Sequence, residues 1–167
     1  MNAIITALDF CGLDTLMFKL RARMRSTAPA TFRLVPGVKP LLRYLWEHDQ
    51  QLAVVSTRPE ADALTFLHQH GLDEWFSLVV TNTTTQRLKP HPEPVLYAVE
   101  RLGCTLDACV MVGDTPVDVR AARRAGVWAI GVLCGFGEAR ELHRAGAHLV
   151  LPSTADLLPM LDQTSEI

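Results

Sequence analysis

The chain has 167 residues, of which 49% are hydrophobic and 20% are charged, and its formal net charge is −2. This length favours one domain, and the composition excludes a disordered chain. The near-neutral charge gives no indication of a nucleic-acid partner, and no apolar run is long enough to cross a membrane. The four cysteines show no C-x-x-C spacing, and the first residues lack a signal-peptide pattern. We therefore expect a cytoplasmic protein with reduced thiols.

Continuous apolar runs alternate with helical patterns along the chain. The runs predict strands that are covered on both faces, at 3–8, 51–56, 77–81, 108–112, 127–133 and 147–151. The helices are expected at 37–48, 59–70, 92–102, 116–125, 137–145 and 154–162. Repeated strand–helix units predict an α/β fold with a three-layer, Rossmann-like, doubly wound parallel sheet. We expect residues 1–162 to form one domain and the tail 163–167 to fray.

Polar side chains follow four of these strands, where a parallel sheet binds its ligands. The candidate site residues are Asp9, Ser56, Thr57, Lys89, Asp114 and Asp118. Asp114 and Asp118 lie on one turn after a buried strand, and two carboxylates so placed suit Mg²⁺. The alternative is structural: Asp114 caps the following helix and Asp118 interacts with its dipole.

The other candidates suit an anion. Ser56 ends a buried strand and precedes a helix start, where a hydroxyl and backbone N–H groups would bind a phosphate; the alternative is a helix cap by Ser56 or Thr57. Lys89 stands beside Pro90 and close to Pro92, which hold it out of regular structure. Its ammonium would hold a phosphoryl oxygen, and the alternative is a solvated loop lysine.

The order of these segments resembles the haloacid dehalogenase superfamily, and within it the phosphoglycolate phosphatase-like branch. The resemblance rests on LVPGVKPLLRYL, LAVVSTRPEADALTFLHQHGLDEWF, RLKPHPEPVLYAVERLG, VMVGDTPVDVRAARRAGVWAIGV and GFGEARELHRAGAHLVLPSTADLLPML, and covers residues 34 to about 162. It implies a Mg²⁺-dependent phosphomonoester hydrolase that acts on a small phosphorylated metabolite through an aspartyl-phosphate. By this resemblance, Asp9 and Lys89 would be catalytic. Phosphate would bind Ser56, Thr57 and Lys89, and the metal would bind Asp9, Asp114 and Asp118.

The first motif departs from the family pattern, which has two aspartates two residues apart. Aligned without a gap, Ala7 stands at the position of the nucleophile and Asp9 at that of the acid/base. This register is favoured because it keeps the match of Asp14 and Thr15. In a second register Asp9 is the nucleophile and Cys11 replaces the acid/base. The favoured interpretation is a catalytically impaired phosphatase scaffold with weakened Mg²⁺ binding. An active phosphatase that uses Asp9, and a phosphate-binding or protein-interaction module, are the alternatives.

The helical cap domain of this branch is expected to be absent or vestigial, because only residues 17–34 separate the first motif from the next helix. Apolar residues recur at helical spacing over 13–25, and Lys19, Arg21, Arg23 and Arg25 make this stretch basic. The simpler interpretation is an amphipathic helix packed on the sheet. The alternative is a surface for a homodimer or a protein partner.

Overall fold

The computed structural model describes residues 3–6 and 33–162 of the chain. Six strands form one sheet in the order β3-β2-β1-β4-β5-β6, and every neighbouring pair is parallel. The strands are β1 (Ala3–Thr6), β2 (Gln51–Val55), β3 (Leu78–Val80), β4 (Cys109–Gly113), β5 (Trp128–Val132) and β6 (Leu149–Leu151). The predicted parallel α/β sheet is therefore confirmed.

Helices connect the strands, as expected for parallel pairing. The α-helices are α2 (Val38–Glu47), α3 (Glu60–His70), α4 (Glu93–Leu102), α5 (Pro116–Ala125), α6 (Ala139–Ala145) and α7 (Leu157–Asp162). Short 3₁₀ turns are η1 (Asp73–Trp75), η2 (Leu106–Ala108) and η3 (Thr154–Asp156). The last predicted helix, 154–162, is thus divided into η3 and α7.

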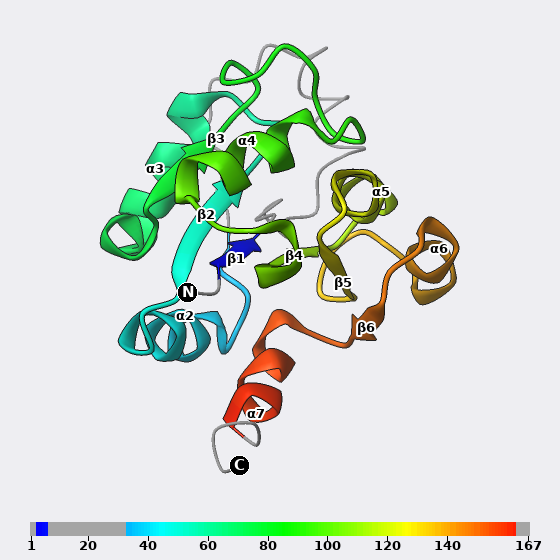
Figure 1. Ribbon diagram of the computed structural model, residues 1–167. Coiled ribbons are helices and arrows are strands. Elements are labelled where there is room, and N and C mark those ends of the chain that lie inside the picture. Colours follow the sequence, from blue (N-terminus) through cyan, green and yellow to red (C-terminus); the bar gives the residue numbers. More distant parts are fainter. Residues whose placement is uncertain (1–2, 7–32, 163–167) are drawn as a thin grey trace, which may run out of the picture.

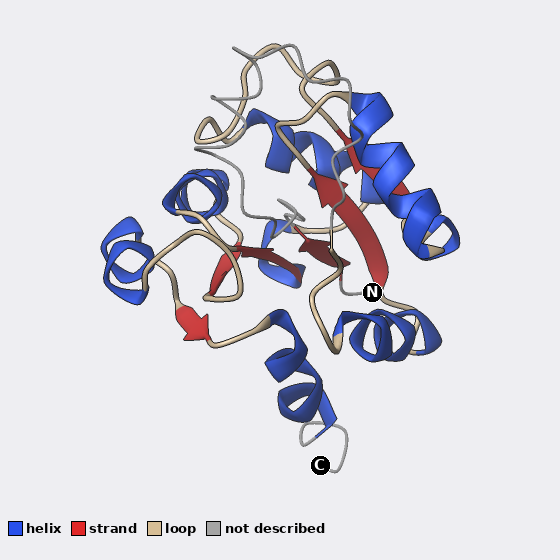
Figure 2. Ribbon diagram, turned by 180° about the vertical axis from the view of Figure 1, so that it is seen from behind, coloured by secondary structure: helices blue, strands red, loops and turns tan. Residues whose placement is uncertain are grey.

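Two hydrophobic cores lie on opposite faces of the sheet. Strand β2 contributes to both, because Ala53 and Val55 pack with α4, α5 and α6, whereas Leu52 and Val54 pack with α2, α3 and α7. Figures 1 and 2 show α5 and α6 on one side of the strands and α2 and α7 on the other. This double coverage explains why the strands are continuous apolar runs rather than alternating ones.

Several predictions concern residues outside the described part of the chain. These are the register of Ala7 and Asp9, most of the vestigial cap at 17–34, the association surface at 13–25, and the tail at 163–167. Among the helices in the described ranges, none combines the length and the hydropathy needed to span a bilayer. The three described cysteines, Cys104, Cys109 and Cys134, are not in disulfides.

Candidate functional site

The strand order reverses beside β1, which lies between β2 and β4. Thr6 at the end of β1 is level with Val54 on one side and Val112 on the other. The residues that follow β2 and β4 therefore flank the carboxyl end of β1, the point at which doubly wound sheets bind their ligands. Ser56 and Asp114 are those residues. Asp9, which follows β1 in the sequence, lies outside the described residues.

Ser56 is buried at the end of β2, with 3% of its surface exposed. Its backbone N–H donates to the Val80 carbonyl at 2.8 Å, and its Oγ accepts a 3.1 Å hydrogen bond from the Arg58 N–H. The N-cap of α3 is Pro59, so the interpretation of Ser56 or Thr57 as a helix cap is wrong. The turn instead fixes the Ser56 hydroxyl at the carboxyl edge, with the partly buried Thr57 beside it.

Lys89 is buried, although it belongs to a loop. Its Nζ donates to the Val55 carbonyl at 2.8 Å and to Asp118 Oδ1 at 2.6 Å. The interpretation as a solvated lysine is therefore wrong. The ammonium joins the end of β2 to the first turn of α5. The predicted site segments around Ser56, Lys89 and Asp118 therefore lie together.

Asp118 closes a capping box at the start of α5. Its Oδ2 accepts hydrogen bonds from the Thr115 N–H at 3.1 Å and from Thr115 Oγ1 at 2.5 Å, and Thr115 Oγ1 accepts in turn from the Asp118 N–H at 3.3 Å. Thr115 rather than Asp114 is therefore the N-cap. Gly113 permits this approach, since a Cβ there would lie 2.3 Å from the Cβ of Asp118.

Asp114 is held by the loop that follows β5, from Gly135 to Gly137. Its Oδ2 accepts a 2.9 Å hydrogen bond from the Phe136 N–H, and its carbonyl accepts one from the Gly137 N–H at 2.9 Å. A Cβ on Gly135 would lie 1.8 Å from Asp114 Oδ2, so only glycine fits there. This loop was not among the predicted site segments, although the G-x-G after the fifth strand, Gly135-Phe136-Gly137, is the signal that could have identified it.

The loop after β3 contributes a further set of hydroxyl and amide groups to the same edge. The Thr81 N–H donates to Thr84 Oγ1 at 2.9 Å, and the Asn82 N–H donates to the Arg58 carbonyl at 3.2 Å. The Asn82 Oδ1 is buried and has no hydrogen-bond partner among the described residues. The third and second strands are thus joined at their carboxyl ends, and Asn82 offers one acceptor for a ligand or water.

The donor set fits Mg²⁺ in part. Mg²⁺ is usually held by one or two carboxylates, with water and phosphate oxygens completing its shell, and Asp114 is a carboxylate fixed at the predicted position. Asp118 uses both carboxylate oxygens for Lys89 and Thr115, and is therefore a weaker candidate as a direct ligand. No cluster of three or more His, Cys, Asp or Glu suited to a metal occurs in the described ranges. Asp9 would have to supply the second carboxylate.

Comparison with known families identifies the chain. The model of the haloacid dehalogenase-like hydrolases matches residues 8–132. The chain therefore belongs to this family.

Particular relatives agree with the family assignment. The chain is 29% identical over 138 residues to phosphoglycolate phosphatase 1 of Pseudomonas aeruginosa, covering 83% of this chain and 51% of that protein. It is 31% identical over 128 residues to the phosphoglycolate phosphatase of Salmonella paratyphi A, covering 77% and 51%. The chain spans about half the length of these curated relatives. A solved hydrolase from Pseudomonas syringae has the same fold, with a TM-score of 0.80 at 23% identity and coverage of 98% and 99%.

Proposed function

We propose that this chain is a Mg²⁺-dependent phosphomonoester hydrolase scaffold of the phosphoglycolate phosphatase-like type, which binds a small phosphorylated metabolite but hydrolyses it poorly. The observation that supports phosphoryl binding best is the buried Lys89 ammonium, held by Val55 and Asp118 at the carboxyl edge of the sheet. The names of the curated relatives support the substrate class.

Each described side chain has a part in this proposal. Lys89 would donate to a phosphoryl oxygen without reorganising, because its Nζ is already fixed by two hydrogen bonds. The Ser56 hydroxyl and the N–H groups after it, with Thr57, would hold further oxygens. Asp114, with Asp9, would hold Mg²⁺, which when bound neutralises charge on the phosphoryl group. Asp118 would orient Lys89 and only indirectly affect the metal.

The impairment is located at Ala7. In the gap-free register this residue stands where the family has its nucleophilic aspartate, and a methyl group cannot form an acyl-phosphate or bind a metal. Loss of a nucleophile that acts together with other groups lowers turnover by about 10⁴–10⁶-fold. The site would therefore keep its affinity for phosphate while losing most of its chemistry.

The decisive experiment restores the missing group. Turnover of p-nitrophenyl phosphate with Mg²⁺ is measured for the wild type, for Ala7→Asp and for Ala7→Asn. We expect a wild-type rate close to background and a gain of about 10²-fold or more for Ala7→Asp only, because Asn has the same size without the nucleophile. A folded Ala7→Asp variant with no gain would reject the register and the proposal with it.

An active phosphatase that uses Asp9 is the second candidate. The intact set of Ser56, Lys89 and Asp114 favours it, since these side chains have retained a buried geometry suited to a phosphoryl group. In this case the wild type turns over substrate, Asp9→Asn abolishes turnover, and Ala7→Asp brings no gain. The same assay thus separates the two candidates.

A third use of the scaffold is a phosphate-binding or protein-interaction module in the cytoplasm, without a nucleic-acid or membrane partner. The basic stretch 13–25 supports an association surface for a second copy or another protein. Sedimentation of the chain beside a variant with Lys19, Arg21 and Arg23 changed to Gln tests this surface. An unchanged monomer–dimer distribution would exclude it as a dimer interface.

A further inference from the structure

A pocket of about 510 Å³ opens at the amino end of the sheet, at the opposite end of β2 from Ser56. It lies between the end of α2, the turn into β2, η1 and the residue before β3. Its lining includes Trp46, Glu47, Asp49, Glu74, Trp75 and Ser77. The proposed phosphatase site uses none of them.

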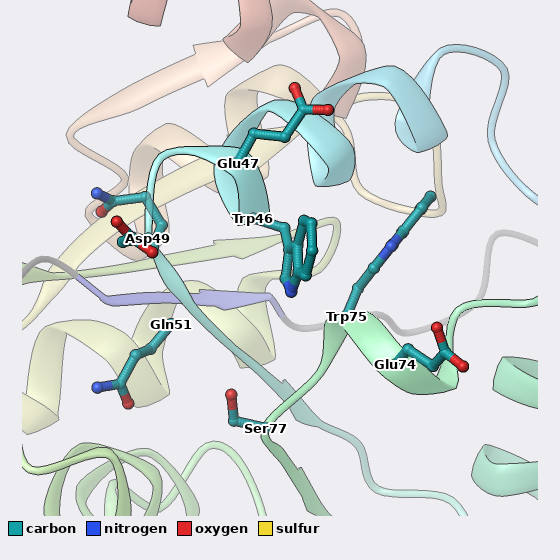
Figure 3. A pocket seen from close by; sticks show the side chains of 8 residues that line it. Trp46, Glu47, Asp49, Gln51, Glu74, Trp75 and Ser77 are labelled. Atoms are coloured by element: carbon teal, nitrogen blue, oxygen red, sulfur yellow. The ribbon is translucent and has the colours of Figure 1, made fainter.

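Two indole rings form the centre of this pocket. Figure 3 shows Trp46 and Trp75 beside each other with an opening between their rings. Trp46 is 55% exposed, although nothing in the fold requires an indole at this position on the outer face of α2. Indole is the best of the aromatic faces for a cation, so the exposed Trp46 beside the partly buried Trp75 favours a positively charged ligand.

The charge of the lining points to the same kind of ligand. Glu47, Asp49 and Glu74 line the pocket together with the two indoles, and none of the lining residues is Lys, Arg or His. None of these carboxylates forms a salt bridge within residues 33–162. A phosphorylated metabolite would be repelled by the negative charge of this lining, whereas a cation would be attracted both by that charge and by the indole faces.

We propose that this pocket, which is lined by Trp46, Trp75 and three carboxylates, binds the guanidinium group of an arginine side chain from a partner protein. A guanidinium is planar, stacks on indole and donates to a carboxylate through a fixed fork, whereas an ammonium ion does only part of this. Tryptophan and arginine are also the residues most often found at the energetic centres of protein interfaces. The inference goes beyond the phosphatase proposal and does not depend on it.

Intrinsic fluorescence tests the proposal directly. Two of the three tryptophans line the pocket, and the third, Trp128, stacks on His148 at the start of β5. The full chain is titrated with N-acetyl-arginine amide and, at equal salt, with N-acetyl-citrulline amide, which has the same shape without the charge. We expect saturable quenching by the arginine compound with a dissociation constant on the order of 1 mM, and at least tenfold weaker binding of the citrulline compound.

Variants locate the binding. Trp46→Ala and Glu74→Gln should each weaken binding at least threefold, while Trp128→Phe and Glu100→Gln, an exposed carboxylate on α4, should leave it unchanged. Because Trp46 and Glu74 are exposed, both variants should fold, and circular dichroism verifies it. Equal binding of the citrulline compound, or unchanged binding in folded Trp46→Ala and Glu74→Gln, would overturn the proposal. If free L-arginine binds ten times more tightly than the blocked compound, the proposal of a partner protein is wrong and the ligand is the free amino acid.

Discussion

Lys89 Nζ lies 2.6 Å from Asp118 Oδ1, and each side chain is only 1% exposed. A buried ion pair is costly, because both charges lose their hydration, and it commonly adds little net stability. The role of this pair is to position two segments, because the same ammonium also donates to the Val55 carbonyl at the end of β2. The pair fixes the distance between the Ser56 turn and α5, and therefore the width of the proposed phosphoryl site.

Removing one member of this pair should destabilise the protein strongly. Lys89→Met leaves the Asp118 carboxylate buried without its cation, and we expect a loss of about 3–5 kcal/mol in the free energy of unfolding. Urea denaturation measures this. Lys39→Met, which removes an exposed lysine on α2, should change stability by less than about 0.5 kcal/mol.

A double-mutant cycle then separates the pair from its surroundings. Lys89→Met combined with Asp118→Asn should be more stable than Lys89→Met alone, because no uncompensated charge remains. Strictly additive losses would mean that the two side chains are not coupled in solution.

The loop after β5 should tolerate no side chain at Gly135. Alanine there would bring a Cβ to 1.8 Å from Asp114 Oδ2 and 2.4 Å from its Cγ, and Asp114 is a short, buried side chain that cannot move aside. We expect Gly135→Ala to cost about 1–3 kcal/mol of stability and to weaken Mg²⁺-dependent phosphate binding, measured by calorimetry. Phe136→Ala is the matched control: it keeps the N–H that binds Asp114 and removes only a 43% exposed ring. Equal losses in the two variants would contradict a specific clash between a side chain at residue 135 and Asp114.

The capping box at Thr115 makes a separate prediction. Thr115→Val keeps the shape of the side chain but removes the hydroxyl that donates to Asp118 and accepts from its N–H. The expected loss is about 1–2 kcal/mol in thermal or urea unfolding. Thr115→Ser retains the hydroxyl and should remain close to the wild type. If Val and Ser behave alike, the cap contributes nothing.

Much of the fold could be predicted from the chain because its signals are local. Continuous apolar runs arise when a strand is covered on both faces, and β2 is such a strand, with Leu52 and Ala53 packed on opposite sides. The sheet is parallel because a helix follows each strand. Edge strands were harder to delimit: β6 begins at Leu149 rather than at residue 147.

The site was only partly predictable, because its contacts join segments far apart in the sequence. Ser56, Lys89 and Asp114 could be proposed from their positions after strands. The burial of Lys89 depends on its ion pair with Asp118, 29 residues away. The position of Asp114 depends on the hydrogen bond from the Phe136 N–H, 22 residues away. No local pattern around Lys89 distinguishes a buried loop lysine from a solvated one. The hydrogen bond to Asp114 comes from the backbone N–H of Phe136, and every residue except proline has such a group, so the side chain at residue 136 does not indicate it.

Cys109 and Cys104 form a thiol pair near the amino end of β4. Cys109 Sγ donates to Cys104 Sγ at 3.3 Å, and Cys109 is fully buried. Burial, followed by the hydrogen bond and charge of Cys104 and the charge of Asp107, raises the pKa of the Cys109 thiol from 9.0 to about 12. The folded protein therefore keeps this proton over a pH range in which the unfolded chain releases it.

The raised pKa of Cys109 predicts an alkaline loss of stability that removal of this thiol should reduce. Because the pKa is higher in the folded state, its contribution is complete below pH 9 and is lost as the pH rises from 9 towards 12, by up to about 1 kcal/mol per pH unit. Urea unfolding of the wild type and of Cys109→Ala is compared at pH 7.5, 9 and 10.5. The difference in stability between the two should shrink above pH 9, because only the wild type has this thiol proton to lose.

Cys134→Ala, at a partly buried cysteine away from this pair, controls for other groups that titrate in the same range. A constant difference between the wild type and Cys109→Ala across the series would show that the thiol titrates alike in both states.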